Sequence, residues 1–126
     1  MRPIHYILED GVPIACDDIQ KWGDYMETED RIVRKTQLVL NGMNILVSTI
    51  FLGVDHQFAQ DENLPPLLFE TMIFTGSRNH NLEHMMWRAP SINGAQSNHE
   101  KAIAEIQRYE KSGKCTILSD TLHRPD

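Results

Sequence analysis

The alternation of apolar and polar residues predicts an antiparallel sheet in the middle of the chain. Arg31–Leu40 is rich in β-branched and apolar residues, and Ile45–Val54 is the most apolar segment. The Asn-Gly dipeptide between them is typical of a tight hairpin turn. A third strand is expected at Leu67–Phe74, after a loop over residues 57–66, which completes a three-strand meander. Because Ile45–Val54 is apolar on both faces, it is expected at the centre of a sheet covered on both sides.

The N-terminal region predicts a hairpin followed by a helix. His5–Leu8 and Val12–Cys16 flank a glycine turn, and Asp17 or Asp18 is placed to cap a helix that runs to about Thr28. The apolar stripe of this helix consists of Ile19, Trp22 and Met26.

The C-terminal region predicts one longer helix. Residues 75–90 show no regular pattern, whereas Ser91 is a suitable N-cap for a helix from Ile92 to about Lys111. A short strand is expected at Cys115–Leu118, with a loose tail from Asp120. The apolar stripe of the long helix consists of Ala95, His99, Ala102, Ile103, Ile106 and Tyr109. The whole pattern predicts one α+β domain over residues 1–126, with two helices packed on an antiparallel sheet of about four to five strands.

Composition places the chain among ordinary globular domains. It has 126 residues, of which 40% are hydrophobic and 24% are charged, and this is enough apolar material for one core. No segment has the length and hydrophobicity of a transmembrane helix or a signal peptide, so a cytoplasmic protein without membrane contact is expected. Cys16 and Cys115 fit no redox or metal-binding spacing and are expected to be reduced thiols.

The formal charge of −6 is carried by the N-terminal region. The first 30 residues hold eight acids and only two bases, Arg2 and Lys21, whereas the remaining residues are balanced. The eight acids are Glu9, Asp10, Asp17, Asp18, Asp24, Glu27, Glu29 and Asp30. Such a surface repels phosphate backbones, so no nucleic-acid partner is expected, and it suits a basic protein partner. The alternative is a solvated face that aids solubility.

Polar residues on apolar strand and helix faces are candidates for a site. Glu70 lies within the expected strand Leu67–Phe74, His99 lies in the helical stripe, and Asp55 and His56 end the central strand. If the helix packs on the face that carries Glu70, then His56, Glu70 and His99 form a set that can bind zinc or provide a histidine base. The alternatives are a pocket for a ligand other than a metal and a buried polar network that fixes the fold.

A second candidate is the sequence His80-Asn-Leu-Glu83-His84, which matches the H-x-x-E-H pattern of inverted zinc metallopeptidases. On a helix, the two histidines would share a face and hold a metal while Glu83 activates water. The segment is short and lies between glycine and proline, so an exposed polar loop is the alternative. Phosphate-binding, dinucleotide-binding and nucleophile-elbow motifs do not occur.

Two stretches carry a family resemblance: Ile-Leu-Val-Ser-Thr-Ile-Phe-Leu-Gly-Val-Asp-His-Gln-Phe at 45–58 and Pro-Pro-Leu-Leu-Phe-Glu-Thr-Met at 65–72. They resemble a family of short uncharacterised phage, prophage and bacterial proteins with V-S-T-V-F-L-G-x-D-H-x-F, then P-P-L-L-[FW]-E-T-M-V-F-G-G, then a helix with G-H-x-x-x-V. The positions that match are Ser48, Thr49, Asp55, His56, Glu70, Thr71 and His99. Asn98 and Thr75 stand where the family has glycine.

The resemblance implies a phage or mobile-element setting, in which small accessory proteins often act by binding. The leading hypothesis is therefore a binding protein without catalysis or cofactor, whose partner is a host defence protein or a small anionic, nucleotide-like ligand. One alternative is a zinc-dependent hydrolase that uses the His/Glu/His set. Another is a structural protein, in which the polar residues specify the fold or a homodimer.

Overall fold

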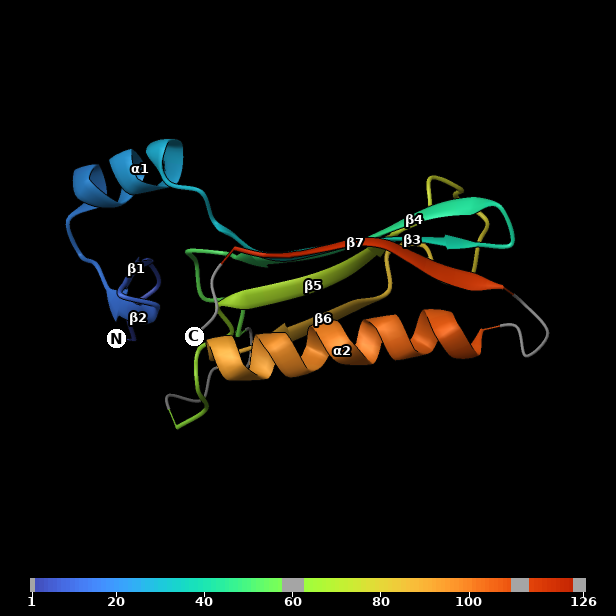
Figure 1. The fold of residues 1–126 in the computed structure, drawn as a ribbon. Helices are drawn as coiled ribbons and strands as arrows, with labels where there is room; N and C mark the ends of the chain where they lie inside the picture. Colours follow the sequence, from blue (N-terminus) through green and yellow to red (C-terminus); the bar gives the residue numbers. More distant parts are fainter. Residues whose placement is uncertain (1, 58–62, 110–113, 124–126) are drawn as a thin grey trace.

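The computed structural model describes residues 2–57, 63–109 and 114–123. Along the chain, the elements are β1 (Tyr6–Glu9), β2 (Val12–Ala15), α1 (Ile19–Thr28), β3 (Ile32–Leu40), β4 (Met43–Phe51), β5 (Phe69–Phe74), β6 (Met86–Ala89), α2 (Ile92–Arg108) and β7 (Cys115–Leu122). All strand pairs are antiparallel, and they form a five-stranded sheet in the order β6-β5-β4-β3-β7 and a separate β1-β2 hairpin (Figure 1). The α+β class is confirmed, with more strands than predicted.

The predicted meander forms the centre of the five-stranded sheet. Asn41 and Gly42 connect β3 to β4 with φ angles of 51° and 82°, and two consecutive positive φ values are typical of a tight type I′ hairpin turn. β4 pairs with β3 on one side and with β5 on the other. The Asn-Gly dipeptide therefore fixes the register of the hairpin from which the sheet extends.

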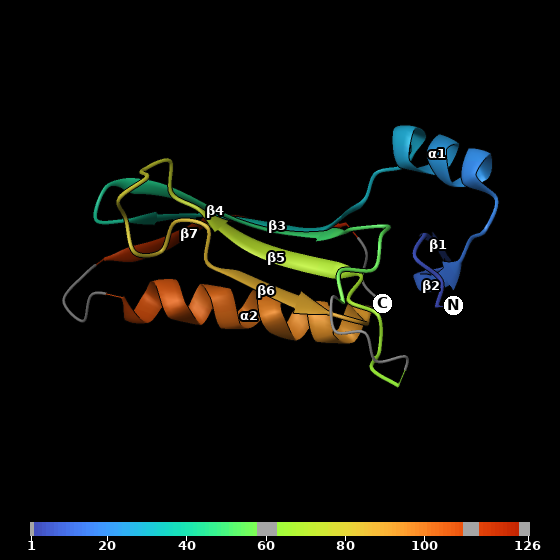
Figure 2. The same cartoon turned by 180° about the vertical axis from the view of Figure 1, so that it is seen from behind.

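Only one face of this sheet is covered by a helix. Alternate residues of β4 are buried beneath α2, whereas Leu46, Ser48 and Ile50 between them are only half-buried. α1 does not lie along a face of the sheet: it lies beyond the end of the sheet beside the β1-β2 hairpin, where its Tyr25 ring packs edge to face on Phe51 of β4 (Figures 1 and 2). The predictions that both faces of the central strand are covered and that two helices pack on the sheet are therefore wrong.

α2 packs along the sheet through the predicted stripe. The Ser91 side chain accepts a hydrogen bond from the Gly94 N–H, which confirms the N-cap. The helix ends at Arg108, with Tyr109 as the C-cap, three residues before the predicted end. The buried helix residues are Ile92, Ala95, His99, Ala102, Ile103 and Ile106. The apolar stripe of α2 covers one face of the sheet, and the core lies between the two.

Two segments that were predicted to be irregular are strands. β6 lies within residues 75–90, and the expected loose tail from Asp120 is the end of β7, which pairs with β3. β6 has only four residues, and seven of the eight β7 residues are exposed. Neither strand shows the apolar alternation that reveals a half-buried strand, because each lies at an edge of the sheet.

The N-terminal module, residues 2–30, is held to the end of β4 by backbone hydrogen bonds and by the packing of Leu8 and Tyr25 with Phe51. Asp18 caps α1 and accepts hydrogen bonds from two backbone N–H groups. The Trp22 indole N–H donates to the Gly53 carbonyl at 2.9 Å. Gly53 has a φ of 75°, which favours glycine, and a Cβ there would lie 2.5 Å from the Met26 sulfur, so the Met26 side chain would have to move. Ile19 is 58% exposed and lies outside these contacts. Neither described helix combines the length and apolar character needed to cross a membrane.

Candidate functional site

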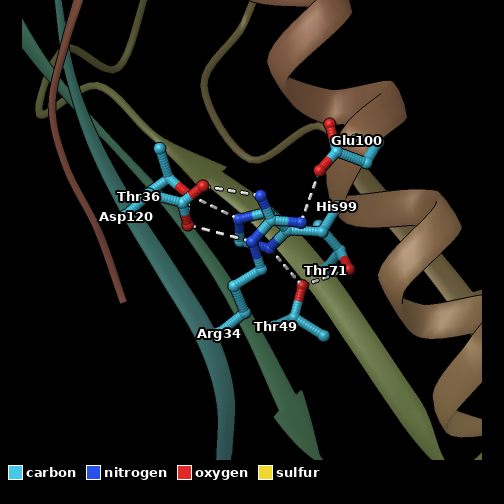
Figure 3. Close-up of polar contacts among 7 residues, drawn as sticks. All are labelled: Arg34, Thr36, Thr49, Thr71, His99, Glu100 and Asp120. Carbon is cyan, nitrogen blue, oxygen red and sulfur yellow. Dashed lines mark hydrogen bonds and ion pairs between the residues drawn. The ribbon is translucent and has the colours of Figure 1, made fainter. Parts of the chain in front are cut away.

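The covered face of the sheet contains a chain of hydrogen-bonded side chains centred on His99 (Figure 3). His99 is fully buried on α2 and contacts two strands. Its Nε2 atom lies 2.8 Å from Thr36 Oγ1 on β3, and its Nδ1 atom lies 2.7 Å from Thr49 Oγ1 on β4. Thr49 Oγ1 lies 2.6 Å from Thr71 Oγ1 on β5. One helical histidine thus connects α2 to the three central strands.

The direction of each hydrogen bond follows from Asp120, which is the last acceptor in this series of side chains. The Thr36 hydroxyl donates to Asp120 Oδ1 at 2.8 Å, so Thr36 can only accept from His99 Nε2–H. A neutral imidazole has one donor and one acceptor, and Nδ1 therefore accepts from the Thr49 hydroxyl. Thr49 in turn accepts from Thr71. This arrangement selects the Nε2-protonated tautomer of His99.

Arg34 binds the last residue of this hydrogen-bonded series, Asp120, near the surface. Its guanidinium donates to both oxygens of Asp120, at 2.9 and 2.6 Å, and to Glu100 Oε1 at 2.6 Å. The hydrogen bond from Arg34 lowers the pKa of Asp120, and the same bond raises the pKa of Arg34. Because β3, β7 and α2 each contribute one of these residues, the ion pairs tie the edge strand and the helix to the sheet.

His99 is neutral at physiological pH. Burial lowers its pKa to about 4, and the nearby Arg34 charge acts in the same direction. Both ring nitrogens are engaged by threonine hydroxyls, and the side chain has no exposed surface. The arrangement is that of a satisfied buried polar network, which corresponds to the structural alternative for His99.

Glu70 lies on the opposite face of the sheet from His99. It is adjacent in β5 to Thr71, and successive strand residues point to opposite faces. Glu70 pairs across the strands with Arg88, with 3.2 Å between the carboxylate and Nε. His56 lies in the segment after β4, and its Nδ1–H donates to the Val54 carbonyl at 2.9 Å. The expected meeting of Glu70 with His99 is therefore wrong, because α2 packs on the other face.

Asp55, which lies after β4, holds three separate parts of the chain together through its carboxylate. Its side chain is only 3% exposed, and Oδ1 accepts hydrogen bonds from the N–H groups of Gln57 and Leu67 at 2.7 and 2.9 Å. Oδ2 lies 3.0 Å from Arg2 Nε in an ion pair. One carboxylate thus joins the N-terminal segment to the chain at Gln57 and at Leu67.

The His80–His84 segment lies in turns between β5 and β6, not on a helix. The Glu83 carboxylate accepts the Thr75 N–H at 2.9 Å, which lowers its pKa. His80 Nδ1 accepts the Leu82 N–H, and His84 has a φ of 61°. Leu82 is buried in the core between them. The histidines therefore do not share a helix face, and residues 2–57, 63–109 and 114–123 contain no group of three or more metal-ligating side chains.

We define the open face as the side of the five-stranded sheet opposite α2. Half-buried or exposed side chains from all five strands lie on it: Gln37, Leu46, Ser48, Ile50, Glu70, Met72, Phe74, Met86, Arg88 and Leu118. Three of the large apolar residues are 38%, 43% and 59% exposed, namely Phe74, Met86 and Leu118. Exposed apolar side chains that form a contiguous group are typical of interaction surfaces.

One end of the open face is hollowed. A cavity of about 540 Å³ lies where β3, β4, β5 and β7 approach each other. Its lining combines the two amide side chains of Gln37 and Asn44 with the apolar side chains of Leu46, Phe74 and Leu118. The His84 ring contacts Phe74 edge to face, with 5.8 Å between the ring centroids. A second hollow, of about 500 Å³, lies at the N-terminal module between Arg2 and Asp17.

No protein-family model, curated protein or solved structure matches this chain. The resemblance to phage and prophage proteins therefore stays a prediction.

Sequence reasoning identified Thr49, Thr71 and His99 but missed Thr36 and Asp120, their partners on β3 and β7. The available signal was the buried histidine itself, because a buried imidazole requires hydrogen-bond partners among the groups that it faces. The open-face residues Phe74 and Met86 gave no such signal.

Proposed function

We propose that the protein acts by binding another protein, without catalysis, through the open face of its sheet. The observation that carries this proposal is the contrast between the two faces, since α2 seals one face and leaves large apolar side chains accessible on the other. The open-face residues are contiguous in register: Leu46 lies opposite Phe74, and Met72 lies between Ser48 and Met86. A partner can therefore cover neighbouring apolar groups from three strands at once.

The chemistry of this face suits a protein partner. The Glu70–Arg88 pair lies among the apolar residues and offers both a donor and an acceptor. Protein interfaces commonly have an apolar centre with few charges, in which aromatic, methionine and arginine side chains are enriched. Methionine side chains, here Met72 and Met86, also adapt to irregular partner surfaces.

The charge of the N-terminal module favours a partner with a basic rim. The module carries the whole net charge of −6 and lies beyond the end of the sheet (Figure 2). A protein that covers the open face and extends past the end of β4 would meet this acidic region, which would accelerate association with a basic surface. In the phage setting that the resemblance implies, a host defence protein fits this description.

A small anionic ligand is the less favoured candidate. The hollow on the open face has a volume in the range of ligand sites, and Phe74 can stack on a planar ring. However, its lining includes no lysine, arginine or histidine among the described residues. An anion there would lack a counter-charge, so the lining supports an apolar or amide-bearing side chain of a protein as its occupant.

The proposal is tested by site-specific photo-crosslinking in bacterial cells that express the protein. A benzophenone side chain is placed at Met86 on the open face or, as a control, at the exposed residue Lys101 of α2. We expect a discrete adduct with one protein from position 86 and none from position 101. The crosslinked protein is then identified and purified for a direct binding measurement.

The direct measurement decides the outcome. Phe74→Ser should weaken binding of the purified partner at least tenfold, Lys101→Ala should leave it unchanged, and 0.5 M salt should slow association. Binding that is unaffected by Phe74→Ser, or adducts from position 101 alone, would overturn the proposal. A nucleotide recovered with the protein and released by Phe74→Ser would favour the ligand instead.

A further inference from the structure

We propose that two copies of the chain pair edge to edge through β7, in an antiparallel arrangement that extends the five-stranded sheet to ten strands. This inference concerns the assembly of the protein and does not depend on the proposed function. It rests on the exposed edge of β7, on the apolar residues along that edge and on the position of the acidic module.

β7 has a strand neighbour on one side only among the described residues. Its backbone points toward β3 at both ends: the Lys114 carbonyl accepts from Asn41 N–H, and the His123 N–H donates to the Val33 carbonyl. In a strand, alternate residues direct their N–H and C=O groups to the opposite side. β7 therefore presents a row of backbone donors and acceptors to a further strand along its outer edge (Figure 1).

The β7 edge is longer and more apolar than the other edge of the sheet. It has eight residues, and Ile117, Leu118 and Leu122 are 46%, 59% and 49% exposed. β6, at the opposite edge, has four residues and one exposed large hydrophobic side chain, Met86. A long edge with exposed apolar side chains is a template for pairing with another strand.

A bulge is one of the features that usually protect an edge strand, and the other such features are few in β7. It contains no proline and no lysine, and its one charged residue, Asp120, is already bound by Arg34 and Thr36. A register shift opposite Gln37/Leu38 marks a bulge at Leu118, which separates two regular halves of the strand. Neither half carries a charge that would repel an identical strand.

The occupant that fits best is a second copy, because antiparallel pairing is compatible with its charge. A two-fold axis between Leu118 and Ser119 places Ile117 opposite Asp120 and Thr116 opposite Thr121 of the second copy, and each pair points to one face. No like charges of the two β7 strands therefore face each other. The end of β7 lies beside the acidic module, since His123 Nδ1 is 3.1 Å from Asp30 Oδ2. The two-fold axis sends the two modules to opposite ends of a strand about 27 Å long, well beyond the Debye length of about 8 Å at physiological ionic strength.

This pairing also places the two open faces on the same side of the ten-stranded sheet. A two-fold axis perpendicular to the sheet keeps the α2 helices together on the other side. The dimer would therefore present two copies of the open face in one continuous surface. A partner with two equivalent sites would bind such a dimer more tightly than it binds a monomer.

The test is the solution mass of the untagged protein, measured without any partner by native mass spectrometry and sedimentation between 1 and 100 µM. We expect twice the monomer mass of 14.5 kDa at the higher concentrations. Leu118→Lys should weaken dimerisation at least tenfold. Ile19→Lys on α1 is the matched control, because Ile19 and Leu118 are 58% and 59% exposed, and it should leave the dimer intact.

Hydrogen exchange gives a second readout that requires no variant. The amides of residues 115–122 should exchange more slowly at 100 µM than at 1 µM, whereas those of β6 should not change. A monomer at all concentrations, a dimer that survives Leu118→Lys, or a dimer broken by Met86→Lys at the other edge would overturn the inference. Because no partner is present, this failure is separate from failure of the crosslinking experiment.

Discussion

The two faces of the five-stranded sheet are built from the same strands and differ in almost every other respect. Ser48 and Thr49 are neighbours in β4, and Glu70 and Thr71 are neighbours in β5, yet each pair is divided between the faces. The two threonines are buried and belong to the hydrogen-bonded chain that ends at Asp120. Ser48 and Glu70 are only half-buried. The strands are thus stabilised through one face and accessible on the other.

This difference shows how a small domain can separate stability from binding. A buried polar group that loses its partner costs about 1–3 kcal/mol, whereas an exposed ion pair contributes about 0–1 kcal/mol. The covered face therefore tolerates little change, because the ring N–H of His99 and the hydroxyls of its threonine partners each already donate to a neighbour. Open-face residues such as Phe74 are accessible and can contact a partner. The experiments below compare the two faces directly.

The largest expected effect is acid destabilisation through His99. Its pKa is about 4 in the folded protein and 6.5 in the unfolded chain, so the unfolded state binds more protons between these values. Stability is complete above about pH 6.5 and is lost as the pH falls toward 4. A fall from pH 7 to pH 5 should lower the free energy of unfolding by about 2 kcal/mol, as measured by urea denaturation.

The matched control for this effect is a histidine on the surface. His84 is exposed and has a φ of 61°, and asparagine accepts this conformation. His84→Asn should keep the full loss of stability between pH 7 and pH 5, whereas His99→Gln should be less stable at pH 7 and should lose less on acidification. An equal pH dependence in both variants would show that His99 is not the responsible group.

An effect of similar size is expected from the loss of the Thr49 hydroxyl, and the neighbouring Ser48 hydroxyl provides the comparison. Thr49→Val keeps the side-chain shape but leaves His99 Nδ1 without its donor and Thr71 without its acceptor. We expect a loss of about 1–3 kcal/mol in the free energy of unfolding. Ser48→Ala removes the adjacent hydroxyl on the open face and should cost less than about 0.5 kcal/mol. Similar costs for the two variants in the same denaturation assay would contradict the assignment of the faces.

Elements with a strong local pattern could be predicted from the sequence. The Asn-Gly turn, the Ser91 cap and the helical stripe through Ile103 each depend on residues close together in the chain. Of the residues proposed for a site, Thr49 and His99 do lie together, because the stripe and the strand each place a polar side chain toward the core. The predicted polar network is the alternative that their geometry supports.

The choice of sheet face could not be predicted from the sequence. β4 is apolar on both sides, so the pattern allowed α2 to pack on either face. The predicted contact between Glu70 and His99 assumed that α2 packs on the face that carries Glu70, and this is the wrong face. The partners on the correct face are distant in sequence: Thr36 and Asp120 are separated by 84 positions. The strand that carries Asp120 also lies at an edge, where exposure removes the apolar alternation.

The smallest expected effect concerns the Glu70–Arg88 pair of the open face. Both side chains are partly exposed, at 15% and 26%, and water reaches this face, so the pair should contribute less than about 1 kcal/mol. Glu70→Gln, Arg88→Gln and the double variant form a cycle that isolates the interaction in urea denaturation. The Arg88 carbonyl, which accepts from the Asn98 side chain, is unchanged in each variant. A coupling near 3 kcal/mol, of the size expected for a buried pair, would mean that this face is covered in solution, and the accessibility on which the proposed binding surface depends would be lost.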